Sequence, residues 1–322
     1  MQRTLSVINL SAIRNNALRI KKLSKSSKFY AVVKADAYGH GAEEVSRCIE
    51  DIVDGFCVAI IEEGIALRVA GITKKILVFT PPLDCYDVLR ARAYNLTVTV
   101  NSVETAELTG GLPCHIKINT GMNRHGCNLE ELPELLKTVT NAEGVYSHFF
   151  APENDRASEA QFKLFGEAVK LVKRTNPEAI AHISASGGIL RGGKFLSDAV
   201  RCGILLYGYA PKGFSSEGFT PALKVYARRT QTTRFIGGGV GYNFADRKYT
   251  YLSSYRCGYA DGFERGVPLG EKTLCMDAFI SKDGGGLKCV LDDAESYAKK
   301  CKTISYEILT RATMRSEKIY ER

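Results

Sequence analysis

The sequence contains, at residues 30–41, the stretch YAVVKADAYGHG. Its first part continues an apolar run from Phe29, and a continuous apolar run predicts a parallel strand that is buried on both faces. Lys34 follows this run directly, where dry surroundings at the strand end depress the pKa of an amine and leave a nucleophile. Most lysines at strand ends only extend into solvent, so Lys34 alone leaves a structural and a catalytic interpretation open.

Eight short strand candidates recur along the first two thirds of the chain, mostly separated by amphipathic, helix-like stretches. Strand–helix alternation is typical of a parallel sheet, and eight units in about 200 residues favour a closed (β/α)₈ TIM barrel over an open sheet. The candidates are residues 29–33, 55–60, 75–79, 96–100, 115–119, 144–148, 182–184 and 199–203.

A smaller second domain is predicted after the barrel. Residues 211–218, PKGFSSEG, form a turn-rich linker, and the stretch 223–235 is rich in Thr, Val and Arg with little helical periodicity. We therefore expect an α/β protein with a barrel over residues 9–213 and a mainly-β C-terminal domain over residues 214–322, which the strand-like residues 1–8 join.

Composition argues against several classes of protein. The chain has 322 residues, of which 45% are hydrophobic and 25% charged, as in an ordinary globular protein. No apolar window reaches the roughly 18 residues of a membrane span, and the start lacks the apolar core of a signal peptide, so we expect a cytoplasmic protein. Without a secretion signal, the ten cysteines are expected to be reduced, and because they form no Cys-x-x-Cys pair a structural zinc site is not expected. The net charge of +9 is dispersed, so we expect no nucleic-acid partner.

Residues 32–41, VVKADAYGHG, closely resemble the pyridoxal phosphate signature of bacterial alanine racemases, in which the lysine carries the cofactor as a Schiff base. Further motifs follow in the order of that family: SHF at 147–149, VRCGI at 200–204, GYN at 241–243 and CGYADGF at 257–263. The resemblance covers nearly the whole chain. It implies a pyridoxal 5'-phosphate enzyme that interconverts L-alanine and D-alanine and supplies D-alanine for peptidoglycan.

The resemblance implies two catalytic bases, because racemisation removes the α-proton from one face of a planar carbanion and returns a proton to the other. Lys34 and Tyr242 match these bases. A phenol is a poor base near neutral pH, and the family pattern supports it with hydrogen bonds through residues that match His148 and Arg201. Arg201 also matches the donor to the pyridine nitrogen. Since an arginine keeps its proton, the ring is a weaker electron sink, which favours simple reprotonation over transamination.

The resemblance also implies residues that bind cofactor and substrate. The mouth after the last two strands is a common phosphate site in barrels, where hydroxyls and backbone amides bind the oxygens. The matching residues are Tyr38, Ser186, Gly203, Ile204 and Tyr306. The substrate carboxylate is expected to bind Arg124 and the amide of Met276. Lys117 matches a lysine that the family carbamylates to orient that arginine.

A shared active site is a further implication. In the family, the β domain of one subunit lies over the barrel mouth of the other in a head-to-tail dimer. Tyr242 and Met276 would then complete the site of the neighbouring subunit. We therefore expect a homodimer and an inactive monomer.

Four features depart from the family pattern. Asn9 and Asn119 stand where the family has aspartate, and Ala185 stands where asparagine is expected beside the phosphate. The segment after Asp277 is short and contains three consecutive glycines where strands are expected. These departures bear on efficiency and substrate range more than on the chemistry.

Three alternatives stay open from the sequence. A racemase of serine or of a larger amino acid could use the same scaffold, since side-chain selectivity depends on the surroundings of Tyr259, Cys275 and Met276. A non-catalytic barrel that binds pyridoxal phosphate would keep Lys34 but would need neither Tyr242 nor a β domain. A decarboxylase of related fold would place an acidic residue where Arg201 stands.

Overall fold

The computed structural model describes residues 4–25 and 27–322, which fall into two compact units. The barrel unit comprises Ile13–Ala37 and Ala42–Thr220, and the β unit comprises Met1–Ala12, Tyr38–Gly41 and Pro221–Arg322. The predicted range 1–8 includes residues 1–3, which lie outside the described residues. The predicted domain boundary at residue 213 stays a prediction.

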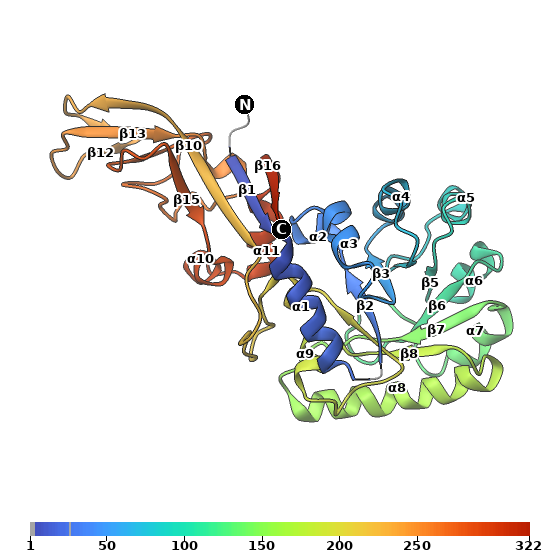
Figure 1. Ribbon diagram of the computed structural model, residues 1–322. Helices are drawn as coiled ribbons and strands as arrows, with labels where there is room; N and C mark the ends of the chain where they lie inside the picture. Colours follow the sequence, from blue (N-terminus) through green and yellow to red (C-terminus); the bar gives the residue numbers. More distant parts are fainter. Residues whose placement is uncertain (1–3, 26) are drawn as a thin grey trace. The chain divides into compact units, whose positions relative to one another are not determined.

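Eight parallel strands form the barrel unit (Figure 1). They are β2 (Lys28–Val32), β3 (Gly55–Val58), β4 (Lys75–Val78), β5 (Val98–Val100), β6 (Cys114–Lys117), β7 (Ala142–Tyr146), β8 (Ile180–His182) and β9 (Ala199–Cys202). They pair in the orders β4-β3-β2-β9 and β5-β6-β7-β8. A parallel bridge between Leu77 and Thr97 connects β4 to β5, and the amide of Arg201 donates to the carbonyl oxygen of Ser184, just beyond β8, at 2.9 Å. The predicted (β/α)₈ barrel is therefore confirmed.

The predicted strands overlap all eight observed strands but differ at their ends. His148 was expected to end its strand, yet β7 ends at Tyr146 because the chain leaves the ladder there. The last predicted strand residue before the seventh loop, Ser184, likewise lies beyond β8. The polar side chains after these strands therefore sit on turns, not within the sheet.

Helices alternate with the barrel strands along the chain (Figure 1). They are α1 (Leu10–Leu23), α3 (Ala42–Ile49), α4 (Ile61–Val69), α5 (Cys85–Ala93), α6 (Val103–Thr109), α7 (Leu132–Thr138), α8 (Asp155–Thr175), α9 (Ser186–Leu190) and the 3₁₀ helix η1 (Ile204–Tyr207). The longest, α8, buries Ser158, Gln161, Phe165, Ala168 and Val172, which recur three and four residues apart and so lie on one face. No helix in the described ranges is long and apolar enough to cross a membrane.

A left-handed turn follows β2 directly. In α2 (Lys34–Tyr38), residues 35–38 all have φ between 52° and 53°. None of them is glycine, and each L-residue in this conformation costs roughly 1–2 kcal/mol. Such strain persists only where the surrounding structure holds it, and it is typical of functional sites. The sequence gives no signal for this turn, because alanine carries no preference for a positive φ.

The β unit contains one large sheet, in agreement with the prediction of a mainly-β second domain. Its strands are β1 (Thr4–Asn9), β10 (Leu223–Arg234), β13 (Tyr251–Tyr255), β14 (Phe279–Ser281), β15 (Leu287–Leu291) and β16 (Ser316–Glu321). Strand β1 pairs antiparallel with β10 and parallel with β16, so the first and the last strand of the described residues lie in one sheet. The hairpin of β11 (Gly239–Val240) and β12 (Asn243–Phe244), the 3₁₀ helix η2 (Tyr259–Asp261), α10 (Ala294–Cys301) and α11 (Ser305–Ala312) complete the unit.

The three glycines after Asp277 form the turn between β14 and β15 rather than replacing a strand. The hydroxyl of Tyr255 donates to the carbonyl oxygens of Asp283 and Gly285, at 3.0 and 2.8 Å. Arg229 bonds the same turn, since its amide donates to the carbonyl oxygen of Gly286 at 2.9 Å and its Nη1 donates to that of Gly284, so two side chains of the sheet hold the turn.

Asn9 provides a stability test, because it caps α1. Its Oδ1 accepts a hydrogen bond from the amide of Ala12 at 2.7 Å. Asparagine and aspartate cap helices almost equally well, and loss of a cap costs about 1 kcal/mol. We expect Asn9→Asp to match the parent protein in urea unfolding and Asn9→Ala to lose about 1 kcal/mol. Equal losses in both variants would contradict the capping role.

Candidate active site

Five predicted site residues of the barrel unit come directly from the carboxyl ends of its strands. Lys117 ends β6 and Arg201 lies in β9, while Lys34, His148 and Ser186 follow β2, β7 and β8 within a few residues. The carboxyl ends of barrel strands open into one mouth, so these side chains gather at the same end of the barrel.

Arg201 is buried, with 2% of its surface exposed, and it has no carboxylate partner among the described residues. Its Nη1 donates to the carbonyl oxygen of His182 at 2.8 Å, and its Nη2 donates to that of Ser147 at 2.6 Å. The guanidinium also lies over the ring of Tyr146, 5.1 Å from the ring centroid. Its Nε donates to no residue that the structure describes, which leaves one donor available.

Two buried histidines extend the Arg201 network into the barrel core. Arg201 is always a donor, so its Nη1 contact of 2.6 Å makes Nδ1 of His182 the acceptor. The proton of His182 then lies on Nε2, which donates to Nδ1 of His115 at 2.7 Å. Burial, more than the nearby cations, lowers the pKa of His115 to about 3 and the pKa of His182 well below its usual value. Both rings therefore orient Arg201 without adding a charge.

Four basic residues influence one another at the mouth: Lys34, Lys117, Arg124 and Arg201. Burial, followed by Arg124, lowers the pKa of Lys34. Burial, followed by Arg201 and Arg124, holds the pKa of Lys117 well below its usual value. Nζ of Lys117 lies 4.4 Å from the ring centroid of Tyr146. The site thus favours neutral lysine amines and attracts an anion.

His148 lies close to Arg201, with 3.4 Å between its Nδ1 and Nη2 of the arginine. Burial and then Arg201 lower the pKa of His148 well below its usual value, so the ring is neutral near pH 7. Gln161 of α8 holds the turn that carries this histidine, because its Nε2 donates to the carbonyl oxygen of His148 at 3.0 Å. Sequence reasoning missed Gln161, although a glutamine in the apolar stripe of a helix was a visible signal.

Arg124 lies on an exposed loop that Asn119 organises. Oδ1 of Asn119 accepts from the amides of Gly121 and Asn123, both at 3.1 Å. Its Nδ2 donates to Oδ1 of Asn123 and of Asn128, both at 3.0 Å. An aspartate could accept the first pair but could not donate the second. The departure from the family pattern at residue 119 therefore gives the loop two additional hydrogen bonds.

The predicted phosphate residues of the barrel unit lie at two short helices. Ser186 is buried at the start of α9, with its Oγ 3.4 Å from Sγ of Cys202. Gly203 precedes η1, which starts at Ile204. Ala185 precedes α9 without a side-chain cap, so this position contributes only backbone.

The remaining predicted site residues belong to the β unit. The rings of Tyr38 and Tyr306 lie 5.9 Å apart between centroids and are tilted by 50°. Tyr242 lies in the turn of the β11–β12 hairpin with 83% of its surface exposed, and Met276 is 52% exposed. No group of three His, Cys, Asp or Glu residues in the described ranges is arranged to hold a metal ion.

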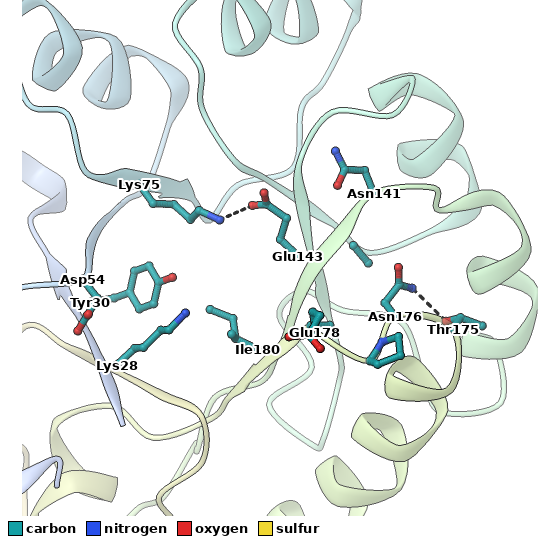
Figure 2. Close-up of a pocket in the computed structure, with 13 residues that line it drawn as sticks. Lys28, Tyr30, Asp54, Lys75, Asn141, Glu143, Thr175, Asn176, Glu178 and Ile180 are labelled. Carbon is teal, nitrogen blue, oxygen red and sulfur yellow. Dashed lines mark hydrogen bonds and ion pairs between the residues drawn. The ribbon is translucent and has the colours of Figure 1, made fainter. Parts of the chain in front are cut away.

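A cavity of about 620 Å³ lies at the opposite end of the barrel strands, and none of these residues lines it. Figure 2 shows the ion pair of Lys75 and Glu143, 2.6 Å long, and the hydroxyl of Tyr30 pointing into the cavity. Its walls come from the amino-terminal starts of β2, β4, β7 and β8. That end of a barrel serves stability rather than catalysis, so we interpret the cavity as a solvent-filled depression without a catalytic role.

Comparison with known proteins agrees with this arrangement. The family model "Alanine racemase, N-terminal domain" matches residues 8–211. The chain belongs to the alanine racemase family. An alanine racemase of Carboxydothermus hydrogenoformans is 35% identical, over 97% of this chain and 98% of that protein.

Solved structures extend the likeness to three dimensions. The alanine racemase of Clostridium difficile superposes with a TM-score of 0.88 at 29% identity, covering 100% of this chain and 96% of that one. The alanine racemase of Bartonella henselae, solved with covalently bound pyridoxal phosphate, has a TM-score of 0.83 at 25% identity and covers 100% of both chains. This chain is thus an amino acid racemase, an isomerase that acts on alanine.

The buried histidines predict how stability depends on pH. The pKa values of His115, His148 and His182 are all lowered by burial, whereas histidines of the unfolded chain titrate near 6.5. Below pH 6.5 the unfolded chain binds more protons, so stability falls with falling pH, by up to about 1.4 kcal/mol per pH unit for each histidine. Urea unfolding between pH 7 and pH 5 measures this slope.

Two variants separate the buried histidines from the others. His115→Asn should unfold more easily at both pH values but with a smaller slope between them. His125→Asn, at an exposed position, should leave the slope unchanged. A slope that is the same in all three proteins would contradict the assignment of neutral buried imidazoles.

Proposed function

We propose that this chain racemises alanine with pyridoxal 5'-phosphate by a two-base mechanism, in the cytoplasm and for the synthesis of peptidoglycan. The observation that carries the proposal is the set of four basic residues at the barrel mouth, with Arg201 buried and without a carboxylate partner among the described residues. The covalent pyridoxal phosphate of the Bartonella henselae relative supports the choice of cofactor.

The side chains at the mouth fit this cofactor. Nε of Arg201 has no partner among the described residues and can donate to a ring nitrogen, while Ser186 and the amides of Gly203 and Ile204 can donate to phosphate oxygens. Tyr38 and Tyr306 add two hydroxyls to the predicted set. The bound cofactor supplies a conjugated ring that withdraws electrons from Cα of the substrate.

Lys34 has two tasks in this proposal. Its lowered pKa leaves a larger fraction of neutral amine, which attaches the cofactor covalently. The same amine then takes or returns the α-proton on one face of the substrate, and the Tyr242 hydroxyl serves the other face. Arg201 holds its own proton while it donates its hydrogen bond, so it limits electron withdrawal and favours return of the proton to Cα.

Arg124 binds the substrate carboxylate, together with the amide of Met276, and Lys117 supports it after modification. The buried, neutral amine of Lys117 can add to carbon dioxide and release a proton, which forms a carbamate. A carbamate converts a repelling cation into an anion that accepts hydrogen bonds from Arg124.

The active assembly is a head-to-tail homodimer in this proposal, with Tyr242 and Met276 contributed to the site of the partner. The β11–β12 hairpin supports this view, since Tyr242, Phe244 and nearby Ile236 are 83%, 92% and 96% exposed. Clustered exposed apolar side chains mark interaction surfaces.

The direct test of function is the formation of D-alanine from L-alanine by the purified protein with added pyridoxal phosphate. We expect turnover at an ordinary enzymatic rate of about 1–10³ s⁻¹, and its loss in Lys34→Ala. Serine, assayed in parallel, should react more slowly. Cofactor binding without D-alanine formation would favour the non-catalytic alternative, and faster turnover of serine would favour a different substrate.

Tyr242→Phe tests the second base. Removal of the hydroxyl should lower kcat about 10²- to 10⁴-fold in both directions, the usual contribution of a general base. Tyr251→Phe removes a hydroxyl from another exposed tyrosine of the β unit and should keep full activity. A normal rate in Tyr242→Phe would show that another residue serves the second face.

A further inference from the structure

The carboxylate of Glu63, in the first turn of α4, binds two strand ends at once. Its Oε1 accepts from the amide of Ala35, after β2, at 2.7 Å. Its Oε2 accepts from the amides of Ala59 and Ile60, after β3, at 2.7 and 3.4 Å. One side chain thus connects the ends of two adjacent barrel strands to the start of a helix.

The bond to Ala35 lies at the first residue of the left-handed turn, immediately after Lys34. Residues 35–38 have positive φ, so without external bonds the turn would relax toward an ordinary backbone conformation. At its other side, Oδ1 of Asp36 accepts from the amide of Ala42 at 2.8 Å. The direction in which the chain presents Lys34 therefore depends on the acceptor that Glu63 supplies.

Glu63 also bears on the charge of Lys34. Burial and then Arg124, from the loop after β6, lower the pKa of this lysine, whereas Glu63 of α4 and Cys57 of β3 act in the opposite direction. Glu63 thus limits how far the pKa of Lys34 falls, and its removal should lower that pKa further.

We propose that Glu63 is a positioning residue for Lys34, which fixes the left-handed turn through the amide of Ala35 and so aims the amine into the barrel mouth. The inference rests on the proposed role of Lys34 in cofactor attachment and adds a residue that acts only through it. It predicts that Glu63 affects the backbone after β2 even without cofactor.

The neighbouring residue provides a matched control. Glu62 also lies in the first turn of α4, but its Oε1 pairs with Nη1 of Arg90 on the surface, at 2.6 Å. Glu62→Gln therefore makes the same chemical change one residue away, without touching the turn. Glu63→Gln keeps one acceptor oxygen for two sets of amides, and Glu63→Ala keeps none.

The first experiment is hydrogen–deuterium exchange of the cofactor-free protein, read by mass spectrometry on a peptide that contains residues 34–38. Loss of a bond to a carboxylate should speed exchange of the Ala35 amide about tenfold in Glu63→Ala, with a smaller effect in Glu63→Gln. Glu62→Gln should exchange like the parent protein. Thermal unfolding of each variant checks that the barrel remains folded.

The second experiment follows the rate at which Lys34 of the cofactor-free protein binds pyridoxal phosphate as a function of pH. The midpoint of this profile should move to lower pH in Glu63→Gln and stay in place in Glu62→Gln. For racemisation, kcat should fall about 10- to 100-fold in Glu63→Gln with a nearly unchanged KM for alanine, as expected for a misplaced reacting group.

The outcomes distinguish the two proposals. The positioning role would be overturned if both Glu63 variants showed the same amide exchange rates and the same pH profile as Glu62→Gln, whatever their racemase activity. Faster exchange in the Glu63 variants, together with a parent protein that racemises nothing, would support the role of Glu63 in the turn and contradict the proposed function instead.

Discussion

The barrel mouth depends on one constraint: Arg201 is buried with no carboxylate partner among residues 4–25 and 27–322. A buried cation is costly unless polar groups compensate it, and here carbonyl oxygens of Ser147 and His182 do so at 2.6 and 2.8 Å. The carbonyl of Ser147 lies just beyond the end of β7, and the carbonyl of His182 ends β8, where it also accepts from the amide of Ser147 at 3.2 Å. Closure of the barrel brings β9 beside them, so the fold itself creates the arginine site.

Burial and neighbouring cations together set the electrostatics of the mouth. Burial is the main cause that lowers the pKa values of Lys34, Lys117 and His148, and the next cause is Arg124 for Lys34 and Arg201 for Lys117 and His148. Neutral amines beside a fixed cation are suited to covalent attachment of a cofactor and to proton transfer. A bound ligand is then expected to supply the negative charge that compensates these basic residues, as the phosphate of the cofactor and the carboxylate of the substrate would do.

Much of this arrangement was predictable from the sequence. Short strand candidates that alternate with helix-like stretches located all eight barrel strands, and the motif around Lys34 predicted the family. Strand ends were less predictable, as His148 illustrates, because the chain leaves a ladder for reasons of tertiary packing. The left-handed turn and the pairing of His182 with His115 were missed, because each depends on neighbours that are distant in sequence and no local pattern reports it. The role of Gln161 was also missed, although its place in the apolar stripe of α8 was a visible signal.

The most direct test of the two-base account is racemisation of L-alanine in deuterated water, with the isotope at Cα of each enantiomer measured early in the reaction. Different residues on the two faces predict D-alanine that carries deuterium from its first appearance, while the remaining L-alanine keeps its original hydrogen. Early D-alanine that retains the hydrogen of the substrate would mean that one base serves both faces and would contradict the account.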